Sequence, residues 1–251
     1  MRTQKQSKKQ ASLPGFRPKQ EDYYFKIESD AYFRRNLPAM EQKGPETSGT
    51  RQVLSGNLRL IELAERANIK PKLMVDIGGS NGYFASAFQK NFGCKAILIE
   101  PSKKAVAFAS KNYPNIKSIR GLASKLPLPD NSVDVVVLKG VLCWIGRESL
   151  LKAVAEIDRV LVEGGHLLIS DFHPDFQRKT INSHVSDGSI FCFKTDHSRI
   201  FTDSGLYSAI ASEVFIDEND VLPGGDIFDF RHKNTVLRKS FLDYYRKVSG
   251  K

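Results

Sequence analysis

The sequence has no apolar run that approaches the roughly 20 residues needed to cross a bilayer. Its basic start, MRTQKQSKKQ, does not lead into the apolar segment of a secretory signal. Cysteine is scarce, and Cys94, Cys143 and Cys192 lie far apart with no C-x-x-C pair. This spacing argues against disulfides and a zinc site, and it fits a reducing cytosol. We therefore expect a cytoplasmic protein without a membrane-inserted segment or a bound metal.

Acidic residues are absent from the first 20 positions, which hold six Lys and Arg residues. Six of the ten net positive charges at pH 7 therefore fall on this segment. Such a tail is either an arm for nucleic acid or another anionic surface, or a solvated, disordered terminus. Because no aromatic residue is interleaved before Phe16, we favour a disordered basic tail over residues 1–20 and a single domain over residues 21–251.

From residue 72 onward, strand patterns alternate with helix patterns. Apolar runs predict seven strands, at residues 72–77, 95–100, 115–120, 132–139, 166–172, 213–217 and 235–240. Amphipathic spacing predicts helices between them, at residues 82–91, 102–112, 148–161 and 204–212. Ser102 is a plausible N-cap, and Gly164-Gly165 ends the helix that begins at residue 148. This alternation predicts an α/β fold: a Rossmann-like, doubly wound, mostly parallel seven-stranded sheet with helices on both faces.

Two regions depart from the alternation. Residues 21–70 show helix patterns at 21–36 and 56–67, and we expect them to form an N-terminal helical lid. Residues 172–202 form a predicted insertion near the acceptor site, in which SIFCFKTDHSRIFT is typical of a hairpin. Its three histidines lack the close spacing of zinc ligands.

The stretch MVDIGGSNGYF, residues 74–84, lacks the residues that a phosphate-binding loop requires. Tyr83 stands after Gly82 where a Walker A loop has Gly-Lys, and the G-x-G-x-x-G spacing of dinucleotide sites is not met. Gly78 permits a tight turn, and Gly82 lets the following helix start close to a ligand. Asp76 would repel a pyrophosphate. A carboxylate beside a glycine loop instead favours a ligand with a cationic end.

A second carboxylate, Glu100, closes KAILIE, the next predicted strand. Ligands of parallel sheets lie beyond the carboxyl ends of the strands, where Glu100 can accept hydrogen bonds from two vicinal ribose hydroxyls. Together with Asp76, it indicates an adenosine ligand that carries a positively charged amino-acid end. S-adenosylmethionine has this chemistry.

Four blocks in residues 72–171 resemble, in order and spacing, the class I S-adenosylmethionine-dependent methyltransferases, particularly the branch similar to the ubiquinone-biosynthesis methylases. They are VDIGGSNGYF, AILIEPS, GLASKLPLPDNSVDVVVL and EIDRVLVEGGHLLISDF. The resemblance implies a transferase whose cofactor contacts come from Asp76, Gly78, Gly79, Ser80, Gly82, Glu100, Pro101, Leu122, Ala123 and Lys139. Within this set, the glycines approach the methionine moiety, Glu100 holds the ribose hydroxyls, and Lys139 and Gly140 supply backbone contacts beside the reaction centre.

The chain departs from the family pattern at two positions. Ser80 stands where the family often has glycine, and Leu122 stands where it often has an acid that reaches the adenine amino group. Leu122 and Ala123 would flank the adenine, and we expect the base to be held by packing and backbone groups.

The segment after the fourth predicted strand reads LKGVLCWI and lacks the Asn/Asp-Pro-Pro-aromatic block of relatives that methylate ring-conjugated amino groups. The resemblance therefore favours O- or C-methylation, either of which can require a general base. His173, which follows the fifth strand, is the leading candidate for this base, and Asp171 could orient it. Alternatively, His173 bonds a backbone group of its loop.

The stretch AYFRRN, residues 31–36, resembles an N-terminal block of bacterial methyltransferases linked to sugar and surface-glycan pathways. We predict substrate contacts from Tyr32, Arg35, Asn36 and Trp144; the alternatives are solvated arginines on an amphipathic helix and a core position for Trp144. A small-molecule acceptor, such as a glycan precursor, is favoured. An RNA- or ribosome-associated methylase that uses the basic tail and a non-catalytic cofactor-binding regulator remain open.

Overall fold

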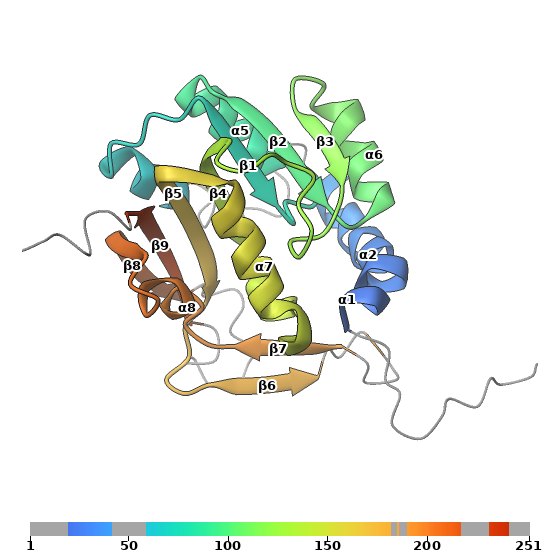
Figure 1. Ribbon diagram of the computed structural model, residues 1–251. Coiled ribbons are helices and arrows are strands. Elements are labelled where there is room, and N and C mark those ends of the chain that lie inside the picture. The colour runs from blue at the N-terminus through green and yellow to red at the C-terminus, as the bar shows by residue number, and fades with distance from the viewer. Residues whose placement is uncertain (1–19, 42–58, 182–184, 186–189, 217–230, 241–251) are drawn as a thin grey trace, which may run out of the picture.

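The computed structural model describes residues 20–41, 59–181, 185, 190–216 and 231–240 (Figure 1). Residues 1–19, and with them nearly all of the predicted basic tail, lie outside this part of the chain. Within the described part, no helix combines the length and apolar character that a membrane span requires.

Seven strands form the central sheet in the order β3-β2-β1-β4-β5-β9-β8. β1 (Leu73–Ile77) pairs with β2 (Lys95–Glu100) on one side and with β4 (Val133–Lys139) on the other, and both pairs are parallel. β3 (Lys117–Arg120) and β5 (Leu161–Phe172) extend the parallel part. β9 (Arg231–Lys239) is antiparallel to both β5 and β8 (Tyr207–Ile216). The predicted mostly parallel, seven-stranded α/β sheet is therefore confirmed.

Helices cover both faces of the sheet because the parallel strands are apolar on both sides. Successive residues of β1 illustrate this. Met74 packs in a core with Phe88 of α5 (Tyr83–Phe92) and Ala109 of α6 (Lys103–Asn112), and helical residues 59–66 contribute to the same core. Val75 packs on the opposite face with Ile157 of α7 (Arg147–Val160). In Figure 1, α7 lies in front of the sheet and α5 behind it.

Local sequence signals place the start of α6 correctly but not the boundary between α7 and β5. The Ser102 Oγ accepts a hydrogen bond from the Ala105 N–H at 3.0 Å, so the predicted N-cap of α6 is confirmed. α7 ends at Val160, but β5 begins at once with Leu161. The expectation that Gly164-Gly165 separates helix from strand is thus wrong: β5 pairs with β4 at Leu161 and again from His166, and the two glycines lie inside the strand at the register shift between these pairs.

The prediction of a helix at residues 204–212 is also wrong. Residues 207–212 lie in β8 (Tyr207–Ile216), which pairs with β9 from Tyr207↔Lys239 to Ile216↔Arg231. Their alternating exposure along β8 is that of an edge strand with one covered face. Small residues such as Ala209 and Ala211 are compatible with a helix, but pairing with a long neighbouring strand decides their conformation.

The insertion contains a two-stranded antiparallel sheet of β6 (Arg178–Ile181) and β7 (Phe191–Lys194), and then α8 (Arg199–Thr202). The hairpin prediction placed both strands within residues 189–202, whereas the partner of β7 precedes that stretch. At the N-terminus, α1 (Gln20–Tyr23), the π-helical η1 (Tyr24–Glu28) and α2 (Ser29–Glu41) follow one another without a gap. We call residues 20–41 the lid segment. It packs on α6 through α2, and its first residue bonds β7.

Candidate functional site

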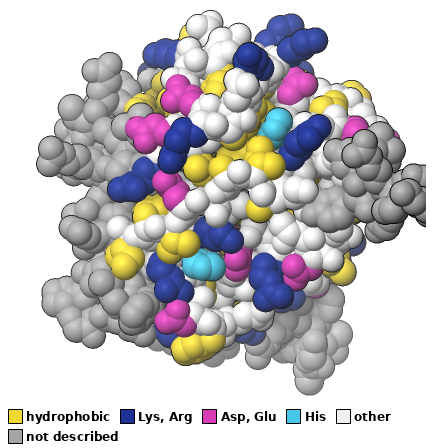
Figure 2. Space-filling model, turned by 90° about the vertical axis from the view of Figure 1, so that its left-hand side faces the viewer, with side chains coloured by type: hydrophobic (Ala, Val, Ile, Leu, Met, Phe, Trp, Pro, Cys, Tyr) yellow, Lys and Arg dark blue, Asp and Glu magenta, His cyan; other side chains and the backbone are white. Residues whose placement is uncertain are grey.

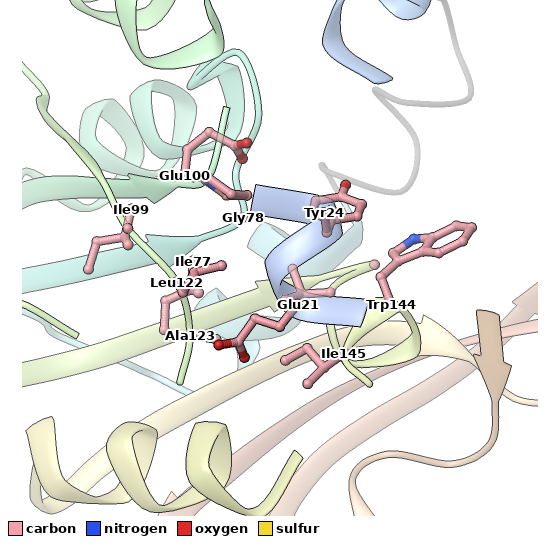
Figure 3. Close-up of a pocket in the computed structure, with 14 residues that line it drawn as sticks. Glu21, Tyr24, Ile77, Gly78, Ile99, Glu100, Leu122, Ala123, Trp144 and Ile145 are labelled. Carbon is pink, nitrogen blue, oxygen red and sulfur yellow. The ribbon is translucent and has the colours of Figure 1, made fainter. Parts of the chain in front are cut away.

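A cavity lies at the carboxyl ends of β1, β2 and β4, where the strand order reverses (Figure 3). It holds about 620 Å³, including space open to solvent. Five of the predicted cofactor residues line it: Gly78, Glu100, Pro101, Leu122 and Ala123. Asp76, Gly79, Ser80, Gly82 and Lys139 are not among the lining residues. The sequence therefore points to the edge of the sheet at which the cavity lies.

The glycine loop after β1 is closely packed against its neighbours. Gly78 has a φ of +72°, and a Cβ there would lie 2.7 Å from Cγ2 of Val141. Its N–H donates to the Ile99 carbonyl at 2.7 Å, which ties the loop to β2. Ser80 has a φ of 51°, in the left-handed region that favours glycine. This conformation explains why glycine suits position 80, and Ser80 adopts it nonetheless.

Glu100 joins the two loops that border the cavity. Its Oε2 accepts the Ser80 N–H at 3.0 Å, and its Oε1 accepts the Ser102 N–H at 2.8 Å. Burial raises the pKa of Glu100 to about 7, and these two backbone hydrogen bonds oppose the shift. A carboxylate oxygen has more than one acceptor site, so Glu100 retains capacity for further donors from the cavity that it lines.

Asp76 is 1% exposed at the end of β1. Its Oδ2 has no hydrogen-bond partner among the described residues, and a Cβ on Gly79 would lie 2.1 Å from it. Burial raises the pKa of Asp76 to about 7; the charge of Lys139 lowers it and that of Glu100 raises it. A buried acceptor without a donor is costly. The orphaned oxygen therefore fits a ligand group that brings a donor or a positive charge to this loop.

The lid segment is held to the site by polar contacts with distant residues. The Gln20 amide Nε2 donates to the carbonyls of Trp144 at 2.7 Å and Phe191 at 2.8 Å. The Asp30 Oδ1 accepts from the Ser102 Oγ at 2.6 Å. Arg120, at the end of β3, donates to the Phe25 carbonyl at 2.8 Å and stacks over the Phe25 ring. The lid segment is thus anchored on β3, α6 and the insertion.

Two cavity-lining residues of the lid segment, Glu21 and Tyr24, were not found by sequence reasoning. The EDYY stretch that contains them combines acid and aromatic side chains. No spacing rule links it to a glycine loop some 50 positions later, as the residue numbers show. Burial is the main cause that raises the pKa of Tyr24 well above its usual value, and the nearby Glu100 charge adds to it.

The predicted substrate residues divide into two groups. Trp144 lines the cavity, whereas Tyr32, Arg35 and Asn36 do not. Arg35 pairs with the buried Glu28, and the Asn36 amide donates to the Tyr32 carbonyl at 2.8 Å within the same helix. A substrate role for the three lid residues stays a prediction.

Asp171 is the penultimate residue of β5 and His173 lies directly after the strand, and the two side chains have different partners. Asp171 is buried, and its Oδ2 lies 3.5 Å from Nδ1 of His197. Nδ1 of His173 lies 3.6 Å from Oδ2 of Asp196, and burial lowers the pKa of His173. The His173 backbone exchanges hydrogen bonds with Arg231. Neither Asp171 nor His173 lines the cavity, and a base role for His173 stays a prediction.

Figure 2 shows the face on the side of β8 and β9, and charges of both signs are interspersed on it. On the described part of that face, Lys and Arg side chains alternate with Asp and Glu side chains and with apolar patches. A nucleic-acid surface would instead gather basic side chains. Within the described residues, no three His, Cys, Asp or Glu side chains gather as metal ligands would.

The chain resembles known methyltransferases in its amino-acid sequence. Residues 75–169 match the family model described as a methyltransferase domain. An uncharacterized protein of Haemophilus influenzae is 30% identical over 174 residues, which cover 63% of this chain and 66% of that protein. A demethylmenaquinone methyltransferase of Chlorobaculum tepidum is 35% identical over 97 residues, or 38% of each protein. The chain thus spans between about a third and two thirds of the length of the curated relatives it matches.

Solved structures extend the likeness to nearly the whole chain. The 1,6-didemethyltoxoflavin-N1-methyltransferase of Burkholderia thailandensis was solved with bound 1,6-didemethyltoxoflavin and S-adenosylhomocysteine. It aligns with a TM-score of 0.65 over 92% of this chain and 93% of that one, at 11% identity. At this identity, the likeness shows a shared fold.

Proposed function

Residues 75–169 belong to the class I S-adenosylmethionine-dependent methyltransferases, and we propose that the protein transfers a methyl group from S-adenosylmethionine to a small-molecule acceptor. The observation that carries this proposal is the pair of buried carboxylates, Asp76 and Glu100, at the carboxyl ends of two neighbouring strands. One has an orphaned oxygen, and the other lines the cavity. They suit a ligand that combines a cationic group with hydroxyl donors.

When bound, S-adenosylmethionine supplies an electrophilic methyl group on a positively charged sulfur. Glu100 accepts hydrogen bonds from the ribose hydroxyls, and Asp76 stabilises the positive charge of the amino-acid end. Gly78 and Gly140 line the cavity with backbone that can approach the ligand closely. Tyr24 and Trp144 limit the access of water to the cavity that they line. The chain thus contributes mainly orientation and desolvation, which are effective for a direct methyl transfer.

We propose a hydroxyl or carbon atom as the acceptor, in a molecule such as a sugar or surface-glycan precursor. The aromatic side chains Tyr24 and Trp144 and the apolar Val141 and Ile145 line the cavity. Such a wall suits the apolar face of a sugar ring or another flat acceptor. For each methyl group gained, the acceptor loses a proton. His173 is the proposed base; full turnover of His173→Ala at saturating substrate concentrations would contradict this role.

A second candidate function, methylation of RNA or a ribosomal component, is supported by the six basic residues in positions 1–19. Deletion of residues 1–19 separates the two proposals, and Gln20 is retained because it anchors the lid segment. A small-molecule enzyme keeps its turnover after deletion and in raised salt. An enzyme that relies on phosphate contacts loses turnover in both cases.

Calorimetry with S-adenosylmethionine tests the cofactor, and transfer of a labelled methyl group into a metabolite extract tests the reaction. Binding with transfer into a low-molecular-weight product supports the proposal. Binding without transfer to metabolites, RNA or protein identifies a cofactor-binding regulator. Absence of binding at millimolar cofactor overturns the proposal as a whole.

A further inference from the structure

One end of the cavity has an apolar wall with a single carboxylate facing it. Leu122 and Ala123 supply the wall beside this carboxylate and Ile99 lies farther along it, whereas Glu100, another carboxylate that lines the cavity, lies at the opposite end (Figure 3). Glu21 reaches the wall from α1 of the lid segment, and Figure 3 shows its carboxylate pointing toward Ala123. A partly buried carboxylate beside apolar surface is stabilised by hydrogen-bond donors.

The position of Glu21 is well defined by its surroundings. Its Oε1 accepts a hydrogen bond from the Ser124 Oγ at 2.7 Å. The preceding residue, Gln20, donates its N–H to Glu148 at 3.0 Å and its amide to Trp144. The second oxygen of Glu21, Oε2, has no hydrogen-bond partner among the described residues. One oxygen thus holds the loop after β3, and the other remains available to a ligand.

Adenine combines the two properties that this end of the cavity matches. Its flat faces are apolar enough to pack between side chains such as Ile99 and Leu122, and its exocyclic amino group carries two hydrogen-bond donors. The Leu122 side chain cannot accept from that group, and a donor left unpaired in an apolar slot is costly. We propose that Glu21 accepts a hydrogen bond from the adenine amino group of the cofactor. This inference rests on the proposed function, because it assigns a contact to the same cofactor.

In most of the cofactor site, the contacts come from loops that follow strands of the sheet, but Glu21 belongs to a helix outside it. The adenine amino group is therefore recognised only when α1 lies against Trp144 and Ser124, as it does in this structure. Binding of the base should therefore stabilise the lid segment in this arrangement.

The test compares two ligands by calorimetry on the full chain. One is S-adenosylhomocysteine, and the other is its purine-riboside analogue, which carries hydrogen in place of the amino group. The unaltered protein is expected to prefer the amino-bearing ligand by on the order of 10-fold or more, as for a hydrogen bond to a charged group. Glu21→Ala should reduce this preference to near unity. Asp22→Ala, an exposed acid one position along the same helix, should keep it.

A double variant provides the positive control. Leu122 lines the same end of the cavity, so Glu21→Ala with Leu122→Asp returns a carboxylate to it and should restore part of the preference. If Glu21→Ala weakens both ligands equally, Glu21 only anchors the lid segment through Ser124, and the inference is wrong. Unchanged affinity for both ligands overturns it as well. Failure of the unaltered protein to bind either ligand would instead contradict the proposed function.

Discussion

The two sides of the cavity are built in different ways. On the cofactor side, Asp76 and Glu100 each stand at the end of a strand, and parallel pairing of β1 with β2 brings them together. On the opposite side, the lid segment meets residues from distant parts of the chain. The Gln20 amide bonds Trp144 and Phe191, which lie 124 and 171 positions away.

The two sides therefore differ in how far apart in the sequence the residues that build them lie. The cofactor side depends on short motifs whose conformation is set by their own glycines and strand ends. The lid side depends on single side-chain contacts between residues far apart in the sequence. Its chemistry can change without disturbing the sheet, as expected where one fold serves many acceptors.

Gly78→Ala is expected to have the largest effect, because it breaks the cofactor side. The new Cβ would combine a left-handed φ of +72° with a 2.7 Å approach to Val141, a stiff β-branched side chain. We expect a loss of about 3 kcal/mol in the free energy of unfolding, and no measurable binding of S-adenosylhomocysteine. Chemical denaturation and calorimetry measure the two effects.

Gly93→Ala is the matched control for that variant. Gly93 has a similar φ of +63°, but a Cβ there would meet nothing within 4 Å. We expect a loss of about 1 kcal/mol from backbone strain, with cofactor binding unchanged. Equal losses in both variants would show that the contact with Val141 is unimportant.

Glu100→Ala is expected to weaken binding of S-adenosylhomocysteine by about 100-fold, since it removes a charged acceptor for the ribose hydroxyls. Glu100→Gln keeps the shape and one acceptor oxygen, so its loss should be smaller, about 10-fold. Calorimetry at constant pH measures both. An affinity for Glu100→Ala equal to that of the unaltered protein would rule out the ribose assignment.

The affinity for the cofactor should rise with pH through about 7, where burial places the pKa values of Asp76 and Glu100. The ionised forms accept the hydroxyls and face the positive charge, so binding releases protons. A roughly 10-fold gain between pH 6 and pH 8 is expected for one group. Calorimetry in buffers of different ionisation enthalpy counts the protons, and Asp76→Asn should flatten the profile.

The same pKa shifts bear on the stability of the cofactor-free protein. Both folded-state pKa values lie above the usual carboxyl values, so the folded protein binds more protons than the unfolded chain between about pH 4 and pH 7. These two groups therefore lower the free energy of unfolding as the pH rises across that window. The measurement is the free energy of unfolding of the unaltered protein minus that of Asp76→Asn, followed from pH 4 to pH 7. A rise of this difference with pH would contradict the assigned pKa values.

Gln20→Ala is expected to have the smallest effect on cofactor affinity, a few-fold, because it acts only on the lid side. Loss of the amide leaves the Trp144 and Phe191 carbonyls without this donor and loosens α1. Hydrogen exchange of residues 20–41 should quicken, while exchange in β1 and β2 stays the same. Arg34→Ala is the control, since its hydrogen bond to the Asp30 carbonyl stays within the helix. Faster hydrogen exchange in β1 would show that the effect of Gln20→Ala is not confined to the lid side.

Much of the fold could be predicted from the sequence, and the predicted family is confirmed by the comparisons. The β2 bounds match the prediction, and Ser102 caps α6 as expected. These features depend on neighbours within one turn or one strand. β8 could not be predicted, because its conformation depends on the neighbouring β9. The contact of Asp171 with His197 could not be predicted either, because it depends on how the insertion folds; a role of Asp171 in orienting His173 stays a prediction.

The sequence by itself determined the alternation of strands and helices, the glycine loop and the two carboxylates at the strand ends. These depend on backbone conformation and burial within short segments, which residue types encode directly. Only the tertiary structure decided that Glu21 and Tyr24 complete the cavity and that Gln20 joins the lid segment to the insertion. Those contacts join residues about 50 to 171 positions apart, and no local preference specifies such a pair.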